Sequence, residues 1–297
     1  MHSIYVDAEI GDDERREKLY DGDLFVYSPR PSTLALTEFA AAMAQSAFAP
    51  LDPETAQFEM AVEEYAALLA DLKPRFIHHP ESKRLIQLML ADFGCDPEQV
   101  YFDVPRMRSS TSDDYLTTGI AFAFHPHRDT WYSAPYVQLN WWLPIFAIGA
   151  DNGLAFHPKY WQTPLRNSSR GYNYAEWNAT SRKIAATQIG IDTRVQPVPE
   201  EDVELVPQIR PICKPGGVIL FSGAQLHSSV PNSSGRTRFS IDLRTVHLGD
   251  ATAGRAAPNI DSECTGTTMG DYLRVRDLNH VPADVVADFD TPHEALA

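Results

Sequence analysis

Residues 124–130 read FHPHRDT, and further along the chain residues 216–232 read GGVILFSGAQLHSSVPN. In the first stretch, His127 and Asp129 are two positions apart and point to the same side of an extended backbone. In the second, a Gly-Gly turn leads into an apolar strand, and the loop after this strand presents His227. Two histidines and one carboxylate form the facial triad of non-haem Fe(II) sites, which keeps coordination positions open for other ligands. We therefore predict a metal site formed by His127, Asp129 and His227.

Residues 236–244 alternate between polar side chains at even positions and Thr or apolar side chains at odd positions, as in a strand with one polar face. Such a face lies either in solvent or in a polar interior site, and the alternation alone leaves both open. Arg238, eleven residues after His227, favours the interior site, because burying an Arg without an acid partner is costly. Its planar, permanently charged guanidinium suits the distal carboxylate of a metal-bound 2-oxo acid. Arg236, on the same face, is the alternative.

The rest of the chain predicts helices first and strands afterwards. Periodic or Ala- and Leu-rich segments predict helices over 34–48, over about 58–72 with an end before Pro74, and over 80–93. Short segments rich in Val, Ile, Phe, Trp and Thr predict strands at Val100–Arg108, Thr118–Phe124, Tyr136–Phe146, Gly153–His157, Gly217–Phe221 and Thr237–His247. This order is typical of an antiparallel double sheet supported by helices. Residues 159–199 form a long insertion of the kind that serves as a lid or binding loop.

The composition is that of an ordinary globular protein, with 43% hydrophobic and 22% charged residues in a chain of 297. Forty acidic residues against 25 Lys and Arg give a net charge of −15, which argues against nucleic acid and anionic membranes as partners. Three cysteines without a CxxC pair predict neither a disulfide framework nor a thiolate zinc site. The start of the chain lacks signal-peptide features and no apolar stretch could span a membrane, so we expect a cytoplasmic protein.

Taken together, four pieces of the chain resemble the phytanoyl-CoA dioxygenase-like branch of the Fe(II)/2-oxoglutarate-dependent oxygenases. They are His127-Arg-Asp129, Asp151-Asn-Gly-Leu154 running to His157-Pro158, Gly216-Gly running to Asn232, and Arg236-Thr-Arg238-Phe-Ser240. They follow the order and spacing of that family over about residues 100–246. The resemblance implies a mainly β fold with flanking N-terminal helices and a double-stranded β-helix (jelly-roll, cupin-like) core. We expect a single domain over 1–297, with helical support at about 30–95, the core at about 100–247 and an irregular tail at about 248–297.

The resemblance also implies the cofactors and the residues that hold them. Fe(II) binds the triad, 2-oxoglutarate is the co-substrate, and O2 takes the remaining position. Arg238, with Ser240 or Ser229 nearby, grips the tail of 2-oxoglutarate, and Trp142 borders it. Where the family usually runs Pro-Gly-Ser-His, this chain has His157-Pro-Lys-Tyr-Trp161, so the substrate stays open.

Several polar or aromatic side chains near these motifs are candidate substrate contacts, namely His125, Gln138, Asn140, His157 and Trp161. Each also has a structural alternative: a hydrogen-bonded strand histidine, a solvent-facing polar strand face, or an aromatic residue of the core. Arg106 and Arg108 share one face of their predicted strand and are candidates to meet an anionic group. No basic patch stands out in the sequence, and the net charge favours a cationic substrate over a coenzyme A ester.

The expected function is oxidation, most simply hydroxylation, of a small-molecule metabolite that is amino-acid-like or a natural-product intermediate, with succinate and CO2 as co-products. Two other classes stay open. One is a cupin-like metalloenzyme that works without a 2-oxo acid, and the other is a non-catalytic jelly-roll binding module. Arg238 discriminates among them, because only the 2-oxo acid needs a buried Arg at that place.

Overall fold

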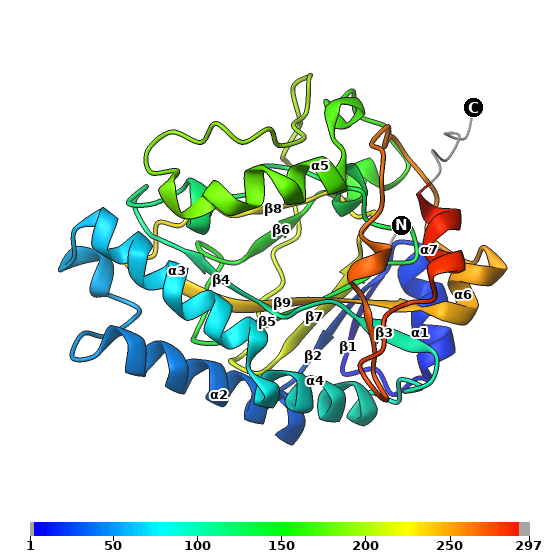
Figure 1. The fold of residues 1–297 in the computed structure, drawn as a ribbon, viewed down its shortest axis with the longest axis horizontal. Coiled ribbons are helices and arrows are strands. Elements are labelled where there is room, and N and C mark those ends of the chain that lie inside the picture. Colours follow the sequence, from blue (N-terminus) through cyan, green and yellow to red (C-terminus); the bar gives the residue numbers. More distant parts are fainter. Residues whose placement is uncertain (1–2, 291–297) are drawn as a thin grey trace.

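The computed structural model describes residues 3–290 and has one large, mostly antiparallel sheet at its centre (Figure 1). The strand order is β1-β2-β7-β5-β9-β3-β10, and β4 pairs with β9 beside β3. The bounds are β1 Ile4–Val6, β2 Leu24–Tyr27, β3 Val100–Phe102, β4 Arg106–Ser110, β5 Leu139–Pro144, β7 Val218–Ser222, β9 Arg238–His247 and β10 Leu273–Arg274. Strands β6 (Leu154–Phe156) and β8 (His227–Ser229) form a second, two-stranded sheet.

Helices cover the face of the large sheet that lies opposite the small sheet (Figure 1). The α-helices are α1 Asp12–Tyr20, α2 Pro31–Phe48, α3 Val62–His78, α4 Pro80–Asp92, α5 Tyr174–Ala179, α6 Leu248–Ala253 and α7 Ala283–Phe289. Short 3-10 helices are η1 Ala56–Phe58, η2 Gly119–Ala121, η3 Asp129–Tyr132, η4 Pro158–Trp161, η5 Ser169–Gly171, η6 Ser181–Thr187 and η7 Met269–Asp271. Within residues 3–290, no helix is both long and apolar enough to cross a membrane.

The two faces of the large sheet serve different purposes, because side chains along a strand alternate between them. Trp141 of β5 and Phe239 of β9 face the helices and belong to the main core, which includes side chains of α2, α3 and α4. The neighbouring Trp142 faces the small sheet, where it packs with Leu154 and Phe156. Burial of such large side chains stabilises the fold by roughly 1.5–3 kcal/mol each. The opposite face is free to carry polar groups between the two sheets.

Most predicted strands are present, at β5, β6, β7 and β9. The predicted strand Val100–Arg108 is instead two strands, β3 and β4, on either side of Pro105, which has no N–H for a sheet. The loop predicted to present His227 contains strand β8. The strand predicted at Thr118–Phe124 is wrong, and η2 lies there. Its Gly119 has φ +60°, and its N–H and C=O bond to Asp192 and Arg194 of the insertion rather than to a strand.

Two of the three predicted helices agree with α2 and α4. The predicted end before Pro74 is wrong, because α3 continues through this proline to His78. A proline inside a helix removes one hydrogen bond, and the burial of Leu72 and Phe76 on both sides of it offsets this loss. The irregular tail expected from residue 248 is also wrong in part, since it contains α6, β10 and α7. The N-terminal elements β1, α1 and β2 were not predicted.

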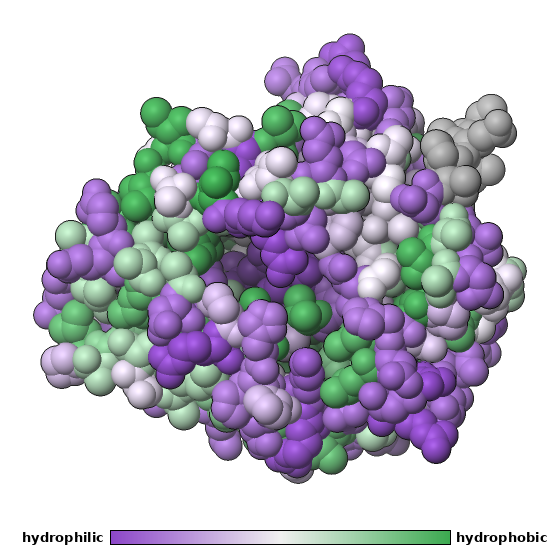
Figure 2. All heavy atoms as spheres, in the orientation of Figure 1, coloured by the Kyte–Doolittle hydropathy of each residue, from purple (hydrophilic) through white to green (hydrophobic). Residues whose placement is uncertain are grey.

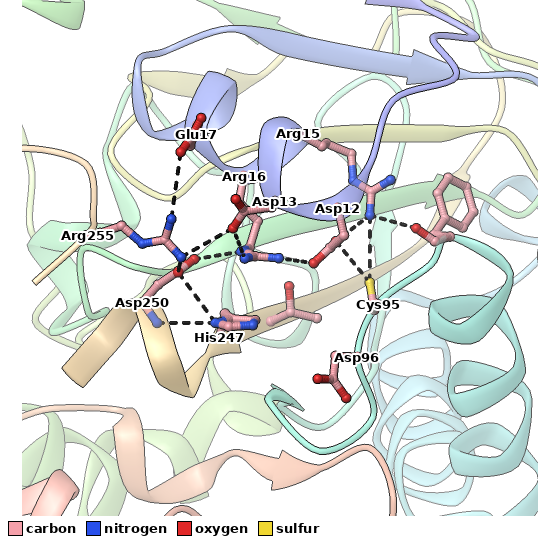
Figure 3. Close-up of polar contacts among 12 residues, drawn as sticks. Asp12, Asp13, Arg15, Arg16, Glu17, Cys95, Asp96, His247, Asp250 and Arg255 are labelled. Atoms are coloured by element: carbon pink, nitrogen blue, oxygen red, sulfur yellow. Dashed lines mark hydrogen bonds and ion pairs between the residues drawn. The ribbon is translucent and has the colours of Figure 1, made fainter. Parts of the chain in front are cut away.

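Helix α1 is joined to the C-terminal part by buried ion pairs, which Figure 3 shows. Arg16 Nε donates to Asp250 Oδ2 at 2.6 Å, and Arg255 pairs with the other oxygen of Asp250. Arg15 and Arg16 both donate to Asp12 at the start of the helix. We call Asp12, Arg15, Arg16, Asp250 and Arg255 the α1 ion network. Because Asp250 and Arg255 follow soon after the end of β9, the α1 ion network attaches this end of β9 to helix α1.

Candidate metal centre

The structure brings together the three residues predicted as metal ligands. Nε2 of His127 lies 3.6 Å from Oδ1 of Asp129, and Nε2 of His227 lies 4.0 Å from the same oxygen. One ligand atom from each residue lies within 4.8 Å of the other two, and all three residues are buried. The backbone produces this approach, because His127 and His227 exchange N–H···O bonds of 2.9 Å and the Asp129 N–H donates to Gly223. Asp129 itself starts η3 rather than continuing a strand.

The ligand atoms are oriented for a metal. Nδ1 of His127 lies 2.8 Å from the carbonyl of His125, and Nδ1 of His227 lies 3.0 Å from the carbonyl of Gln225. A carbonyl accepts only from a protonated nitrogen, so each Nε2 carries the free lone pair that a metal needs. Oδ2 of Asp129 accepts hydrogen bonds from Gln138 and Asn140 and leaves Oδ1 toward the histidines.

The charge states also fit a divalent metal. Burial alone would raise the pKa of the Asp129 carboxyl, but Arg244 and the two histidines outweigh it and hold this pKa below its usual range. Arg244 Nε lies 3.7 Å from Oδ2 of Asp129. Burial, with a smaller contribution from His127, lowers the pKa of His227 to about 4. A carboxylate and a neutral imidazole are the forms that coordinate, and the donor set of two histidines and one carboxylate matches Fe(II).

The three ligands line a cavity of about 380 Å³, a size typical of small-molecule sites. Its walls come from α3, β4, η2, β9 and the 159–199 insertion, which contributes Tyr172, Trp177 and Arg194. On this face of the molecule, Figure 2 shows a hollow with hydrophilic residues around it. The insertion therefore forms part of the cavity wall.

Arg238 lines the same cavity and is only 5% exposed. Its Nη1 donates to the carbonyls of Asn152 and Gly153, at 3.1 and 3.2 Å, and its Nε has no hydrogen-bond partner. Within residues 3–290, no carboxylate pairs with it. Burial and the nearby Arg108 lower the pKa of Arg238 to about 10, so it stays charged at neutral pH. The polar face of β9 thus lies in an interior site rather than in solvent.

The alternative anchor, Arg236, lies elsewhere. Its side chain is 61% exposed and pairs with Glu54 at 3.6 Å. Of the other residues predicted around 2-oxoglutarate, Trp142 and Ser229 line the cavity, and the Arg238 guanidinium lies 5.4 Å from the centre of the Trp142 ring. Ser240 is fully buried, its hydroxyl has no partner, and it does not line the cavity.

Most of the predicted substrate contacts do not line the cavity. Among them only Asn140 lines the cavity, and it bonds to Asp129. Gln138 donates a hydrogen bond to the same carboxylate. His125 lies 3.3 Å from the carbonyl of Pro197, and His157 lies 3.1 Å from the Ser228 hydroxyl, where burial lowers the pKa of His157 to about 4. Trp161 packs in a small apolar cluster with Ala224 and Ala257.

Sequence reasoning missed two residues that support the metal ligands. Arg244 lies on the same strand face as Arg238, so the alternation along β9 could have indicated that it also faces the site. Tyr272 comes from the C-terminal part, and its hydroxyl donates to Oε1 of Gln138 at 2.7 Å. This bond fixes the amide so that its Nε2 points to Asp129. No local pattern marks Tyr272 for this role.

Comparison with known proteins gives only distant structural likenesses. No family model and no curated protein matches the chain. EvdO2 from Micromonospora carbonacea var. aurantiaca is 14% identical, with a TM-score of 0.46 over 82% of this chain and 93% of that chain. EvdO2 complexed with 2-oxoglutarate is matched over 59% of this chain and 62% of that chain, at 14% identity and a TM-score of 0.38. AviO1 from Streptomyces viridochromogenes Tue57 is 16% identical, with a TM-score of 0.40 over 85% of this chain and 100% of that chain.

At these identities and scores the likenesses carry no functional argument. The resemblance to the phytanoyl-CoA dioxygenase-like branch stays a prediction. A function for this chain has to be argued from its own site.

Proposed function

We propose that this chain is an Fe(II)/2-oxoglutarate-dependent dioxygenase that oxidises, most simply by hydroxylation, a small-molecule metabolite, with succinate and CO2 as co-products. One observation carries the proposal. A buried Arg238 without an acid partner lines the same cavity as a His-Asp-His triad. Such an uncompensated charge is costly unless a ligand supplies the counter-charge. We further propose that the large sheet and the β6–β8 pair correspond to the two sheets of a jelly roll.

Each residue has a distinct part in this chemistry. His127 and His227 would supply neutral nitrogen ligands, and Asp129 would supply the anionic oxygen. Arg238 would bind the distal carboxylate of 2-oxoglutarate through its guanidinium, which forms no ion pair with an acid among residues 3–290. Bound iron and 2-oxoglutarate supply oxidative decarboxylation and the oxidising power for attack on the substrate.

The remaining residues orient these groups and keep water out. Gln138 and Asn140 hold one oxygen of Asp129, so the carboxylate presents the other oxygen to the metal. Trp142 lies beside the Arg238 guanidinium and limits its movement. The aromatic residues Tyr172 and Trp177 of the insertion wall off the cavity, which strengthens the charge interactions inside it.

Succinate formation tests the proposal. Protein loaded anaerobically with Fe(II) and 2-oxoglutarate is exposed to air, and succinate is measured in wild type, His127→Ala and Arg238→Met. We expect slow turnover in wild type and none in His127→Ala. In Arg238→Met the half-saturating 2-oxoglutarate concentration rises about ten-fold or more, because a charge-assisted bond is lost. Arg236→Met is the matched control, because that exposed arginine lies outside the cavity, and it leaves turnover unchanged.

Two outcomes contradict the proposal and point to the other classes. Absence of both metal binding and succinate favours a non-catalytic binding module. Metal binding that 2-oxoglutarate does not affect favours a cupin-like metalloenzyme without a 2-oxo acid. A titration of 2-oxoglutarate into the metal-loaded protein accompanies the assay, so an enzyme that turns over only with its substrate is still recognised by binding.

A further inference from the structure

The cavity holds a second buried cation without an acid partner, Lys73 of α3. This side chain lines the cavity, is 8% exposed, and belongs to the buried face of α3. Its Nζ donates to the Ser109 hydroxyl at 3.0 Å and to the carbonyl of Ile120. An ammonium has three donors, so one stays available. No carboxylate among residues 3–290 forms an ion pair with Lys73.

The cavity as a whole is positively charged, although the chain is strongly acidic. Besides the exposed Arg182, six cationic side chains line it: Lys73, Arg106, Arg108, Arg194, Arg238 and Arg244. The acids in the lining are Asp129 and Asp242 alone. The sequence suggested no basic patch and a cationic substrate. The fold corrects this, because it gathers cations from α3, β4, β9 and the insertion around one space.

Four of these six cations have acids of their own. Arg106 and Arg244 pair with Asp103, Arg108 pairs with Asp242, and Arg194 pairs with Asp192. Lys73 and Arg238 do not. Two uncompensated buried cations in one cavity call for two anionic groups.

Lys73 approaches the cavity from the helix-covered side of the β4–β9 pair and Arg238 from its other side, and the two cations bond to different parts of the protein. In the β4–β9 register, Ser110 lies opposite Arg238, and Ser109 lies opposite Phe239. Directly opposed residues share a face, and neighbours on one strand alternate. Ser109 therefore lies on the helix-covered face with Phe239, and Lys73 of α3 bonds to it there.

Arg108 lines the same cavity and acts electrostatically on both unpaired cations. It depresses the pKa of Arg238, and, after burial as the main cause, it also helps to lower the pKa of Lys73 to about 7. Its Nε and Nη2 share one oxygen of Asp242, whereas its Nη1 makes no hydrogen bond to the described residues. Arg108 shares the sheet face of Arg238, but it lies on β4, which pairs with β9 alone among the described strands, and it lines the same cavity as Lys73. Its Nη1 can therefore add a donor to an anion beside Lys73.

We propose that the substrate carries an oxyanion, a carboxylate or a phosphate, which binds Lys73 and Arg108, and that its apolar body extends from there toward the metal ligands. The Phe124 ring lies 5.4 Å from the Arg108 guanidinium and 5.0 Å from the His127 ring, and Phe122 packs on it, so this part of the cavity wall suits an apolar body. The proposal rests on the proposed function only for the reaction that follows binding. The anion site itself depends on Lys73, and the 2-oxoglutarate site depends on Arg238.

Calorimetry with a matched pair of probes tests the proposal. The probes are 4-phenylbutyrate and its neutral amide, titrated anaerobically into protein that is saturated with Fe(II) and 2-oxoglutarate. We expect the acid to bind about ten-fold or more tightly than the amide, because only the acid forms a charge-assisted bond. Lys73→Met removes this preference. Arg75→Met, on the same helix and exposed beside Asp71, keeps it. A third probe, 3-phenylpropyl phosphate, distinguishes a carboxylate site from a phosphate site.

The failures of the two proposals are distinguishable. If neither the acid nor the phosphate binds more tightly than the amide, the anion site is wrong. The same holds if Lys73→Met keeps the preference. Loss of 2-oxoglutarate binding in Lys73→Met would also contradict it, because that site belongs to Arg238. If instead 2-oxoglutarate never binds but the acid preference persists and needs Lys73, the anion site stands and the proposed function fails.

Discussion

At α1, Arg16 meets Asp250 and Asp12, and Arg15 meets Asp12, all within the hydrogen-bonded α1 ion network of Figure 3. In the cavity, Arg238 is as deeply buried as these residues, yet it meets only backbone carbonyls. Lys73 likewise meets one hydroxyl and one carbonyl. Both regions are built from cations removed from water, and they differ in whether the protein supplies the counter-charge.

That difference separates charges that hold the fold from charges that await a ligand. A buried ion pair loses several kcal/mol when one partner is removed, because the other charge is left alone. A cation that the fold leaves alone already carries that penalty, and a bound anion removes it. Whether a buried cation has an acid partner is therefore a better guide to function here than the number of buried charges. The predictions below act on each region in turn.

The largest effect is expected in the α1 ion network. Asp250→Ala removes the acceptor of Arg16 Nε and of the 3.1 Å bond from the Tyr20 hydroxyl, and should lower the free energy of unfolding by about 3–5 kcal/mol. Urea denaturation measures this change. Asp71→Ala, which breaks an exposed pair with Arg75, is the control and should have a much smaller effect. Folded Asp250→Ala should still bind 2-oxoglutarate. Equal stability loss in both variants would remove the distinction between the regions.

A smaller effect is expected for a residue that positions a metal ligand. Asn140→Ala removes a 2.7 Å hydrogen bond to Asp129 and should weaken metal binding about 10–100-fold. Competition with a chromophoric chelator measures the affinity. Asn140→Ser, which keeps a donor, should lose less, whereas a purely structural role would affect both variants alike through stability. Unchanged metal affinity in Asn140→Ala would show that Gln138 alone holds the carboxylate.

The sequence indicated that His127, Asp129 and His227 come together and that Arg238 is buried, because these signals are local. His127 and Asp129 lie two residues apart, and Arg238 belongs to a strand whose alternation is visible over nine residues. Strands β5, β7 and β9 of the large sheet were predicted for the same reason. The helix through Pro74 was missed because burial of its neighbours, which no local pattern shows, decides its length.

The residues that complete the cavity depend on contacts between distant segments. Lys73 was placed at the end of a predicted helix, so nothing indicated that it is buried. Tyr272 acts on Asp129 through Gln138 from the far end of the chain. The strand predicted at Thr118–Phe124 was wrong because the backbone N–H and C=O of Gly119 bond to side chains of the insertion, some 70 residues later, and not to a strand. A net charge of −15 likewise concealed a cavity that is locally positive.

Lys73 offers the most direct test, because its unpaired charge should oppose folding. Burial, and then Arg108 of β4, lowers its pKa from 10.5 to about 7. The unfolded chain therefore binds more protons than the folded one between about pH 7 and 10.5, and stability rises with pH in this window. The penalty is complete below about pH 7 and gone above 10.5. His78 of α3 and Arg182 of η6 also line the cavity, together with the arginines and the two aspartates named above, and the variant leaves them all unchanged.

The measurement is the free energy of unfolding of ligand-free Lys73→Met relative to wild type, by urea denaturation from about pH 6 to about pH 10. We predict that the variant is more stable by about 1–3 kcal/mol at pH 6–7, after the loss of two hydrogen bonds is subtracted. The difference should shrink as the pH rises toward 10. A variant that is less stable than wild type at pH 7 would contradict the account, because Lys73 would then hold the fold as the α1 ion network does.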